Sequence, residues 1–160
     1  MSSSKRHSLR YSTAALFIML FAACKLQTVY HHFEPTPKNG WEKNDTISFV
    51  IGPIAEEGRY AEDVQLRVNG EYPFTALTLL IEQEVALSQE KRVDTLFCSL
   101  FNQQGDAEGG GICQYQYNFR LATMELQKDE KLRVTIRHQM KREILPGIID
   151  IGLRLRHEDR

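Results

Sequence analysis

The stretch Leu132-Arg133-Val134-Thr135-Ile136-Arg137-His138-Gln139-Met140 decides the fold class, because its side chains alternate between two kinds. The even-numbered positions are apolar apart from His138, and the odd-numbered positions carry two arginines, a threonine and a glutamine. A period of two residues is typical of a β-strand with one face buried and one face in solvent. The charged run at residues 128–131 directly precedes it and predicts a solvated turn. We therefore predict a strand in an antiparallel sheet, whose outer face can be wet.

The same period recurs in short runs along the chain, and turn residues separate these runs. The further strand-like runs cover residues 29–33, 47–51, 63–68, 72–82, 95–101, 113–119 and 149–155. No long segment has the 3.6-residue period of a helix. Regularly spaced short strands are typical of a sandwich or barrel. We predict one all-β domain, a single antiparallel β-sandwich of the jelly-roll or immunoglobulin-like kind with about 7 or 8 strands.

Four segments carry more specific predictions about turns, loops and covered faces. Asn69-Gly70 lies between two strand-like runs and predicts a β-hairpin with a type I′ turn. Residues 83–92 are charged and predict a long loop or a single helical turn. The run at residues 95–101 has apolar residues on both faces, so we expect both faces to be covered. The polar, glycine-rich residues 102–111 predict a hairpin loop.

The N-terminus has the pattern of a secretory signal. Lys5, Arg6 and Arg10 precede a short apolar run at residues 14–23, which is shorter than the roughly 20 residues of a membrane-spanning helix. The end of this run, Phe21-Ala22-Ala23-Cys24, resembles a bacterial lipobox, with Phe21 where Leu, Val or Ile is usual. We expect cleavage between Ala23 and Cys24 and lipidation of Cys24. An ordinary secreted protein and a plain membrane anchor are the alternatives.

Cleavage would leave one domain behind a short tether, at residues 24–160. Loss of the three basic signal residues leaves 17 basic against 21 acidic residues, a net charge of −4. This balance excludes a basic surface of the kind that binds nucleic acid through its phosphates. Cys98 and Cys113 remain, and a secreted protein permits a disulfide between them. We favour two unpaired thiols, with a cross-strand disulfide as the alternative.

The sequence contains no persuasive catalytic or metal-binding pattern. The neighbouring His31 and His32 would face opposite ways on a strand, and His138 lies on an apolar face. No Cys/His spacing of a metal site occurs, and Gly109-Gly110-Gly111 lacks the sequence of a phosphate-binding loop. The aspartates at positions 63, 94, 106 and 150 are expected at turns or on exposed strand positions. We therefore expect no enzymatic activity, no metal and no cofactor, and a small-molecule ligand is not expected.

Aromatic residues offer one alternative to a purely structural interpretation. Tyr115, Tyr117 and Phe119 share one face of a strand. They are interpreted as one wall of the core, and the alternative is a stacking platform for a sugar or for a partner strand. The sugar alternative would make the domain a glycan- or peptidoglycan-binding module. Trp41, the single tryptophan, follows Gly40 and is interpreted as a core residue.

Several segments of the mature chain resemble one known family. They are Gly40-Trp41 with Asp45 and Phe49, the run Arg67-Val68-Asn69-Gly70-Glu71-Tyr72-Pro73-Phe74, Asp94-Thr95 with Leu100 and Gly105, and residues 140–152. In these the chain resembles the GldH-type gliding-motility lipoproteins of the Bacteroidota. It departs from them at residues 106–108, where a tryptophan is expected before the glycine-rich loop.

The resemblance implies a non-enzymatic lipoprotein of the cell envelope, needed for gliding and linked to type IX secretion. It implies contacts with other motility or secretion proteins and assigns no catalytic residue. The residues after Cys24 contain no acidic run of the kind that surface-exported lipoproteins of these bacteria often carry. We therefore expect an outer-membrane protein, anchored by its lipid and facing the periplasm.

Overall fold

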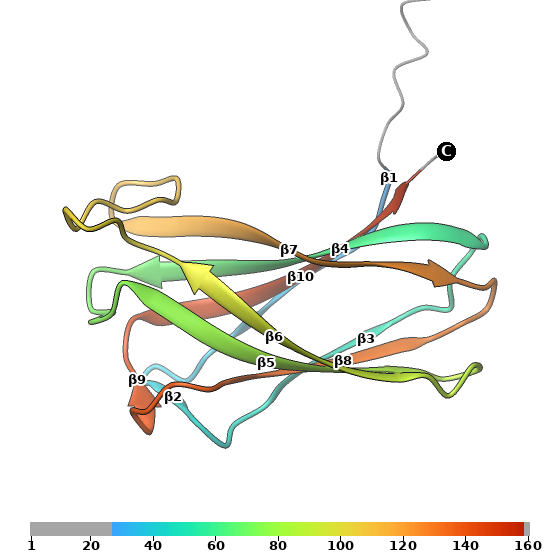
Figure 1. The fold of residues 1–160 in the computed structure, drawn as a ribbon, viewed down its shortest axis with the longest axis horizontal. Helices are drawn as coiled ribbons and strands as arrows, with labels where there is room; N and C mark the ends of the chain where they lie inside the picture. The colour runs from blue at the N-terminus through green and yellow to red at the C-terminus, as the bar shows by residue number, and fades with distance from the viewer. Residues whose placement is uncertain (1–26, 159–160) are drawn as a thin grey trace, which may run out of the picture.

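A computed structural model describes residues 27–158 and contains strands and loops throughout this range. Figure 1 shows two layers of strands that cross the molecule along its longest axis. The strands are β1 (Gln27–Pro35), β2 (Trp41–Glu42), β3 (Ile47–Ile51), β4 (Gly58–Asn69), β5 (Ala76–Val85), β6 (Lys91–Ser99), β7 (Gln114–Leu126), β8 (Leu132–His138), β9 (Ile144–Leu145) and β10 (Ile148–Glu158).

Two antiparallel four-stranded sheets form the layers. Sheet A has the strand order β1-β10-β4-β7, and sheet C has the order β3-β8-β5-β6. The short strands β2 and β9 pair with each other as a separate ribbon. The prediction of an all-β sandwich is confirmed. The eight longer strands match the expected number, and the ribbon adds two strands of two residues each.

The core lies between the two sheets and is built by the predicted alternation. β3 and β8 each bury every second residue, and the apolar side chains of β4, β5 and β10 face them. Trp41 is fully buried, and its Nε1 donates a hydrogen bond to the carbonyl oxygen of Asp45. The interpretation of Trp41 as a core residue is confirmed.

The predicted hairpin at Asn69-Gly70 is wrong. β4 belongs to sheet A and β5 to sheet C, so the turn carries the chain from one layer to the other. Neither Asn69 nor Gly70 has the positive φ that a type I′ turn requires. Instead the N–H of Tyr72 bonds the carbonyl oxygen of Asn69, and the Asn69 side chain accepts from the N–H of Glu71. A type I′ turn matches the twist of two paired strands and needs positive φ values, which this turn lacks. The chain therefore turns away from β4.

The hairpin lies instead within residues 83–92, where a loop or a helical turn was predicted. β5 continues to Val85, β6 starts at Lys91, and the two strands are hydrogen-bonded neighbours. Among the ten strands of the described chain, this is the single pair that is adjacent both in sequence and in a sheet. The polar residue Gln83 faces the interior between Ile81 and Val85, so it interrupts the apolar alternation of the strand.

Two expectations around β6 are also wrong. β6 is an edge strand of sheet C with only its inner face against the core, so the outward ring of Phe97 is mostly exposed. The glycine-rich segment after β6 leads to β7 in the other sheet and is therefore no hairpin loop. This segment folds back on itself, with isolated bridges between Phe101 and Ala107 and between Gly110 and Gln116.

Candidate functional site

The outer face of sheet A carries an ordered network of charged and polar side chains. They occupy the outward positions of neighbouring strands, because the same alternation that buries apolar residues directs the intervening polar ones outward. We call this surface the charged face. It comprises His31, Phe33, Arg59, Asp63, Gln65, Arg67, Asn118, Arg120, Glu125, Asp150, Arg154, Arg156 and Glu158.

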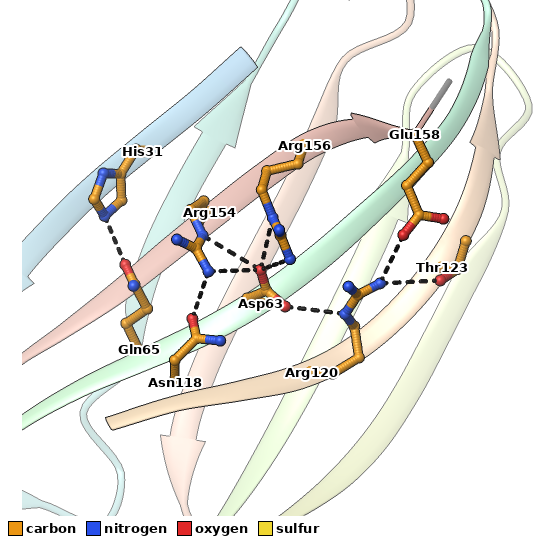
Figure 2. A network of polar contacts seen from close by, with 9 residues as sticks. All are labelled: His31, Asp63, Gln65, Asn118, Arg120, Thr123, Arg154, Arg156 and Glu158. Carbon is orange, nitrogen blue, oxygen red and sulfur yellow. Dashed lines mark hydrogen bonds and ion pairs between the residues drawn. The ribbon is translucent and has the colours of Figure 1, made fainter. Parts of the chain in front are cut away.

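Asp63 is the centre of this network. Its carboxylate contacts three arginines, at 3.0 Å to Nε of Arg120, 3.1 Å to Nη2 of Arg154 and 2.7 Å to Nη2 of Arg156. The three guanidinium groups come from β7 and β10, the strands on either side of β4 (Figure 2). They cover Asp63 so completely that its side chain is 1% exposed. A buried carboxylate needs such partners to offset its desolvation.

A β-bulge sets the register of this centre. Glu62 lies opposite Ala122, and Asp63 lies opposite Arg120, so Leu121 is the extra residue on β7. The bulge lets Arg120 point outward beside Asp63, and the next two residues, Leu121 and Ala122, both contribute to the inner side.

Further polar contacts extend the network across the sheet. Arg120 also contacts Glu158 at 3.0 Å, and Nη2 of Arg154 donates to Oδ1 of Asn118 at 2.9 Å. On the edge strand β1, Nε2 of His31 lies 2.6 Å from Oε1 of Gln65 (Figure 2). The side chains are therefore held in place by contacts among four strands.

A second centre lies farther along the same face. Nε of Arg67 contacts Asp150 at 2.9 Å, and its guanidinium carbon lies 4.2 Å from the centre of the Phe33 ring. Burial raises the pKa of Asp150, and the neighbouring Arg67 opposes this rise. Gly152 lies under the Phe33 ring, where a Cβ atom would come within 2.6 Å of it. The glycine thus leaves room for an aromatic ring on which Arg67 stacks.

The charged face is suited to recognition. It holds five arginines against four carboxylates, and one of those carboxylates, Asp63, lies beneath the guanidinium groups. Guanidinium groups held in a fixed orientation are preorganised donors for carboxylate or phosphate oxygens. The arrangement can therefore bind an anionic or polar surface.

The inner face of β4 has the opposite electrostatic character. Glu62 is fully buried between the sheets, where its Oε2 accepts a hydrogen bond from Nε2 of Gln83 on β5. Its other oxygen, Oε1, has no hydrogen-bond partner among the described residues. Burial raises the pKa of Glu62 to about 7, against smaller lowering effects of Gln83 and Arg92. The rise moves the titration of this carboxyl group toward neutral pH.

The aspartates of the charged face correct one expectation. Asp63 and Asp150 are buried in ion pairs, whereas they were predicted at turns or on exposed strand positions. The available signal was four charged residues at outward positions of three strands: Asp63, Arg120, Arg154 and Arg156. Strand order is needed to bring them together, because Asp63 and Arg156 are far apart in the chain but lie on adjacent strands.

The histidines lie in separate environments. His31 and His32 contact different partners, Gln65 and Glu34 respectively. His138 is buried as predicted from its apolar face, with Nε2 3.1 Å from the carbonyl oxygen of Trp41 and its ring edge-on to the Trp41 ring. Burial lowers the pKa of His138, which favours the neutral ring.

The aromatic side chains of β7 face the interior. Tyr117 is buried, and its hydroxyl donates to the carbonyl oxygen of Leu100 at 2.8 Å. Tyr115 and Phe119 pack against the core beside it. The interpretation as a core wall is confirmed, and these rings do not present the flat exposed platform that stacking on a sugar requires.

The other predicted site residues are placed as follows. Cys98 is a buried free thiol on β6 and Cys113 an exposed free thiol before β7. Burial raises the pKa of Cys98 to about 12, which makes this thiol unreactive. The cleavage and lipidation positions, Ala23 and Cys24, lie outside the described residues.

Residues 27–158 lack two features that would indicate a metal site or a membrane span. Within this range, no three His, Cys, Asp or Glu side chains are grouped in a way that could hold a metal ion. The same range has no helix with the length and hydrophobicity needed to cross a membrane.

Three of the four segments that carried the family resemblance lie against one another, namely residues 40–49, 67–74 and 140–152. The N–H of Asn69 bonds the carbonyl oxygen of Gly147 at 2.9 Å. Gly147 has a φ of 81°, and a Cβ atom there would come within 2.3 Å of the backbone nitrogen of Tyr72. Trp41 pairs with Leu145 in the β2–β9 ribbon. These residues therefore fix the connections at one end of the sandwich, which is a structural role.

Solved structures that match this chain share only low sequence identity with it. A family GH115 4-O-methyl-α-glucuronidase with specificity for decorated arabinogalactans has a TM-score of 0.45 at 11% identity, over 85% of this chain and 18% of that protein. A carbohydrate-binding module from a Cellvibrio mixtus lichenase, in complex with cellotriose, has a TM-score of 0.39 at 14% identity, over 83% of this chain and 91% of that module.

Sequence comparison gives a more specific result. The chain is 26% identical to the gliding motility lipoprotein GldH of Flavobacterium johnsoniae, over 89% of this chain and 92% of that protein. It is also 26% identical to the GldH homologue of Christiangramia forsetii, over 89% of this chain and 91% of the homologue. The family model of the GldH lipoproteins matches residues 28–155, which is nearly the whole described domain. The chain belongs to the GldH lipoprotein family.

Proposed function

We propose that this protein is a gliding-motility lipoprotein, anchored by a lipid on Cys24 to the periplasmic side of the outer membrane. It acts without catalysis, as an accessory component of gliding and of the linked type IX secretion machinery. Its contacts with other envelope proteins are made through the charged face. Family membership and the relatives named for gliding motility support the general role.

The observation that carries the proposed mode of action is the fixed arginine network around Asp63. Three arginines converge on one buried carboxylate, and Arg120 remains 46% exposed at the surface of this network. Such an arrangement is rigid before a partner binds, which lowers the entropic cost of association. A partner with carboxylates on its contacting surface would complement it.

The anchor is tested by metabolic labelling with a palmitate analogue. We expect label on the wild-type protein and none on Cys24→Ala, with the wild-type protein in the outer-membrane fraction. Wild-type protein without label would refute the lipid anchor and leave the contact proposal to be tested separately.

The contact role is tested by complementation of a deletion strain. Arg120→Glu reverses a charge on the charged face, and Arg137→Glu is the matched control on sheet C, where Arg137 is 43% exposed and also ion-paired. We expect the deletion strain to lose gliding or type IX secretion. The Arg120→Glu variant should fail to restore them although its protein level is normal, and Arg137→Glu should restore them. A deletion strain that glides and secretes normally would overturn the proposed function.

A further inference from the structure

The free edge of β6 has the features of a strand-pairing surface. β6 is the last strand of sheet C, and it pairs with β5 without any register shift. On its outer face Val93 is 63% exposed and Phe97 is 67% exposed, with Thr95 between them. A regular edge strand with exposed apolar residues and no proline is a ready template for another strand.

The other edge strands are protected. β1 carries a bulge near Thr28 and ends at Pro35, and β3 has only five residues. The edge of β7 is occupied near its start, where Gln116 exchanges two backbone hydrogen bonds with Gly110. Bulges, prolines, short strands and covering loops are the usual means of blocking edge pairing. β6 has none of them.

Every second residue of β6 has backbone N–H and C=O groups that do not bond β5. The N–H of Val85 bonds the carbonyl oxygen of Glu90, and the N–H of Leu100 bonds that of Thr75. In an antiparallel pair, hydrogen bonding to the neighbour alternates along the strand, so the even-numbered residues of β6 bond β5. The odd-numbered residues therefore direct their N–H and C=O groups away from the sheet. These are Lys91, Val93, Thr95, Phe97 and Ser99.

We propose that two copies of this chain pair through β6 as an antiparallel, two-fold symmetric dimer centred on Thr95. This register places Val93 opposite Phe97 of the second copy and joins the apolar patches of both copies into one surface. It uses all five outward-directed residues, so the whole strand is paired. The two four-stranded sheets C would form one continuous sheet of eight strands.

Two registers shifted toward the start of β6 fit less well. Moving the centre to Asp94 places two like charges directly opposite each other, which is unfavourable. Moving it to Val93 leaves Phe97 opposite Gln89, in the turn before the second copy's β6. The register centred on Thr95 therefore combines full pairing with the burial of both exposed apolar residues.

The dimer is also compatible with a lipid anchor on each copy. Its two-fold axis is perpendicular to sheet C, so both copies of sheet A lie on the same side of the dimer. β1, with which the described domain begins, is an edge strand of sheet A (Figure 1). Both anchors can therefore enter one membrane. The pairing itself does not depend on lipidation.

Cysteine cross-linking tests the register. In the full chain with Cys113→Ser, Thr95→Cys places two thiols opposite each other at a Cα separation of about 5.5 Å, within the range for a disulfide. We expect an interchain disulfide in Thr95→Cys, both in cells and in detergent. Val50→Cys, an exposed position on the outer face of sheet C at its other edge strand, should give no more dimer than the Cys113→Ser background. The proposed register would be overturned if Val93→Cys formed the interchain disulfide and Thr95→Cys did not. It would also be overturned if neither variant formed one.

A second pair of variants tests the pairing without cysteines. Thr95→Pro removes an N–H that is directed away from β5, so it blocks strand addition and leaves the sheet's own hydrogen bonds intact. Phe97→Lys places a charge in the proposed interface at an already exposed position. We expect sedimentation of the detergent-solubilised wild type to give a dimer mass and both variants to give a monomer with unchanged far-UV circular dichroism. A monomeric wild type would overturn the dimer, while the anchor and complementation tests above would be unaffected.

Discussion

Glu62 and Asp63 are consecutive residues of β4, and their carboxyl groups lie in opposite environments. Asp63 faces outward and contacts three arginines, and Glu62 faces the core and contacts only the amide of Gln83. Both side chains are withdrawn from solvent. The comparison shows that two buried carboxyl groups on one strand can differ in the groups around them. The one that no guanidinium group contacts, Glu62, has its pKa raised by burial.

The largest expected effect comes from removing the carboxylate of Asp63. Asp63→Ala leaves three arginines without their shared partner, and we expect a loss of about 4 kcal/mol in the free energy of unfolding. Urea unfolding followed by circular dichroism would measure it. Glu82→Ala on the outer face of sheet C, where a single exposed ion pair is lost, should cost less than about 0.5 kcal/mol. Equal losses in the two variants would contradict the central role of Asp63.

The next effect is a pH dependence caused by Glu62. Its pKa is raised in the folded state from 4.5 to about 7, so between these values the folded state holds a proton that the unfolded state has lost. The contribution of Glu62 to stability therefore falls as pH rises from 4.5 to 7 and is constant above 7. The total fall is roughly 3 kcal/mol, since one pKa unit corresponds to about 1.4 kcal/mol.

Glu62→Gln should remove this pH dependence. Because the amide is neutral, we expect the variant to be more stable than the wild type at pH 8 and to differ little from it at pH 4.5. Unfolding midpoints at the two pH values would measure the difference. If the stability of Glu62→Gln falls between pH 4.5 and pH 8 as much as the stability of the wild type, this assignment is contradicted.

A third prediction concerns the other centre of the charged face. Gly152→Ala places a methyl group against the Phe33 ring and should displace both Phe33 and the stacked Arg67. We expect a loss of about 1–2 kcal/mol from this overpacking. Gly70→Ala is the control, because nothing lies within 4 Å of the position that its Cβ would occupy. The control should change the unfolding midpoint far less.

The smallest expected effects come from replacing single arginines around Asp63 by lysine. Lysine cannot reproduce the forked contact of a guanidinium group. Arg156→Lys should cost about 1 kcal/mol, because Arg156 is mostly buried and makes the shortest contact with Asp63. Arg120→Lys should cost less than about 0.5 kcal/mol, because Arg120 is partly in solvent. The reverse order of the two losses would show that burial does not set the strength of these contacts.

Local pattern predicted the strands better than the connections between them. Residues 47–51 form β3 as predicted, and the alternation from Leu132 continues to His138 in β8. The Asn69-Gly70 turn was misassigned, since its partner strand lies in the other sheet. Turn residues show where a chain can bend. Whether it returns beside the same strand depends on which apolar faces meet across the core.

The charged face could be predicted only in part. The alternation correctly places Asp63, Arg120, Arg154 and Arg156 at outward strand positions, but sequence gives no reason for them to meet. Glu62 was not identified at all, because a single carboxyl group at an inward position has no distinctive sequence pattern. Its partner Gln83 comes from the opposite sheet, within a segment that was predicted as a loop.

The sequence by itself determined the all-β class, the solvent and core faces of most strands, and the membership in the GldH lipoprotein family. These depend on the two-residue period and on short local motifs, which are written in consecutive residues. The tertiary structure alone decided strand order, the single hairpin, and the separation of Glu62 from Asp63 into opposite environments. The physical reason is that ion pairs and core contacts act through space, between residues that only the packing of two sheets brings together.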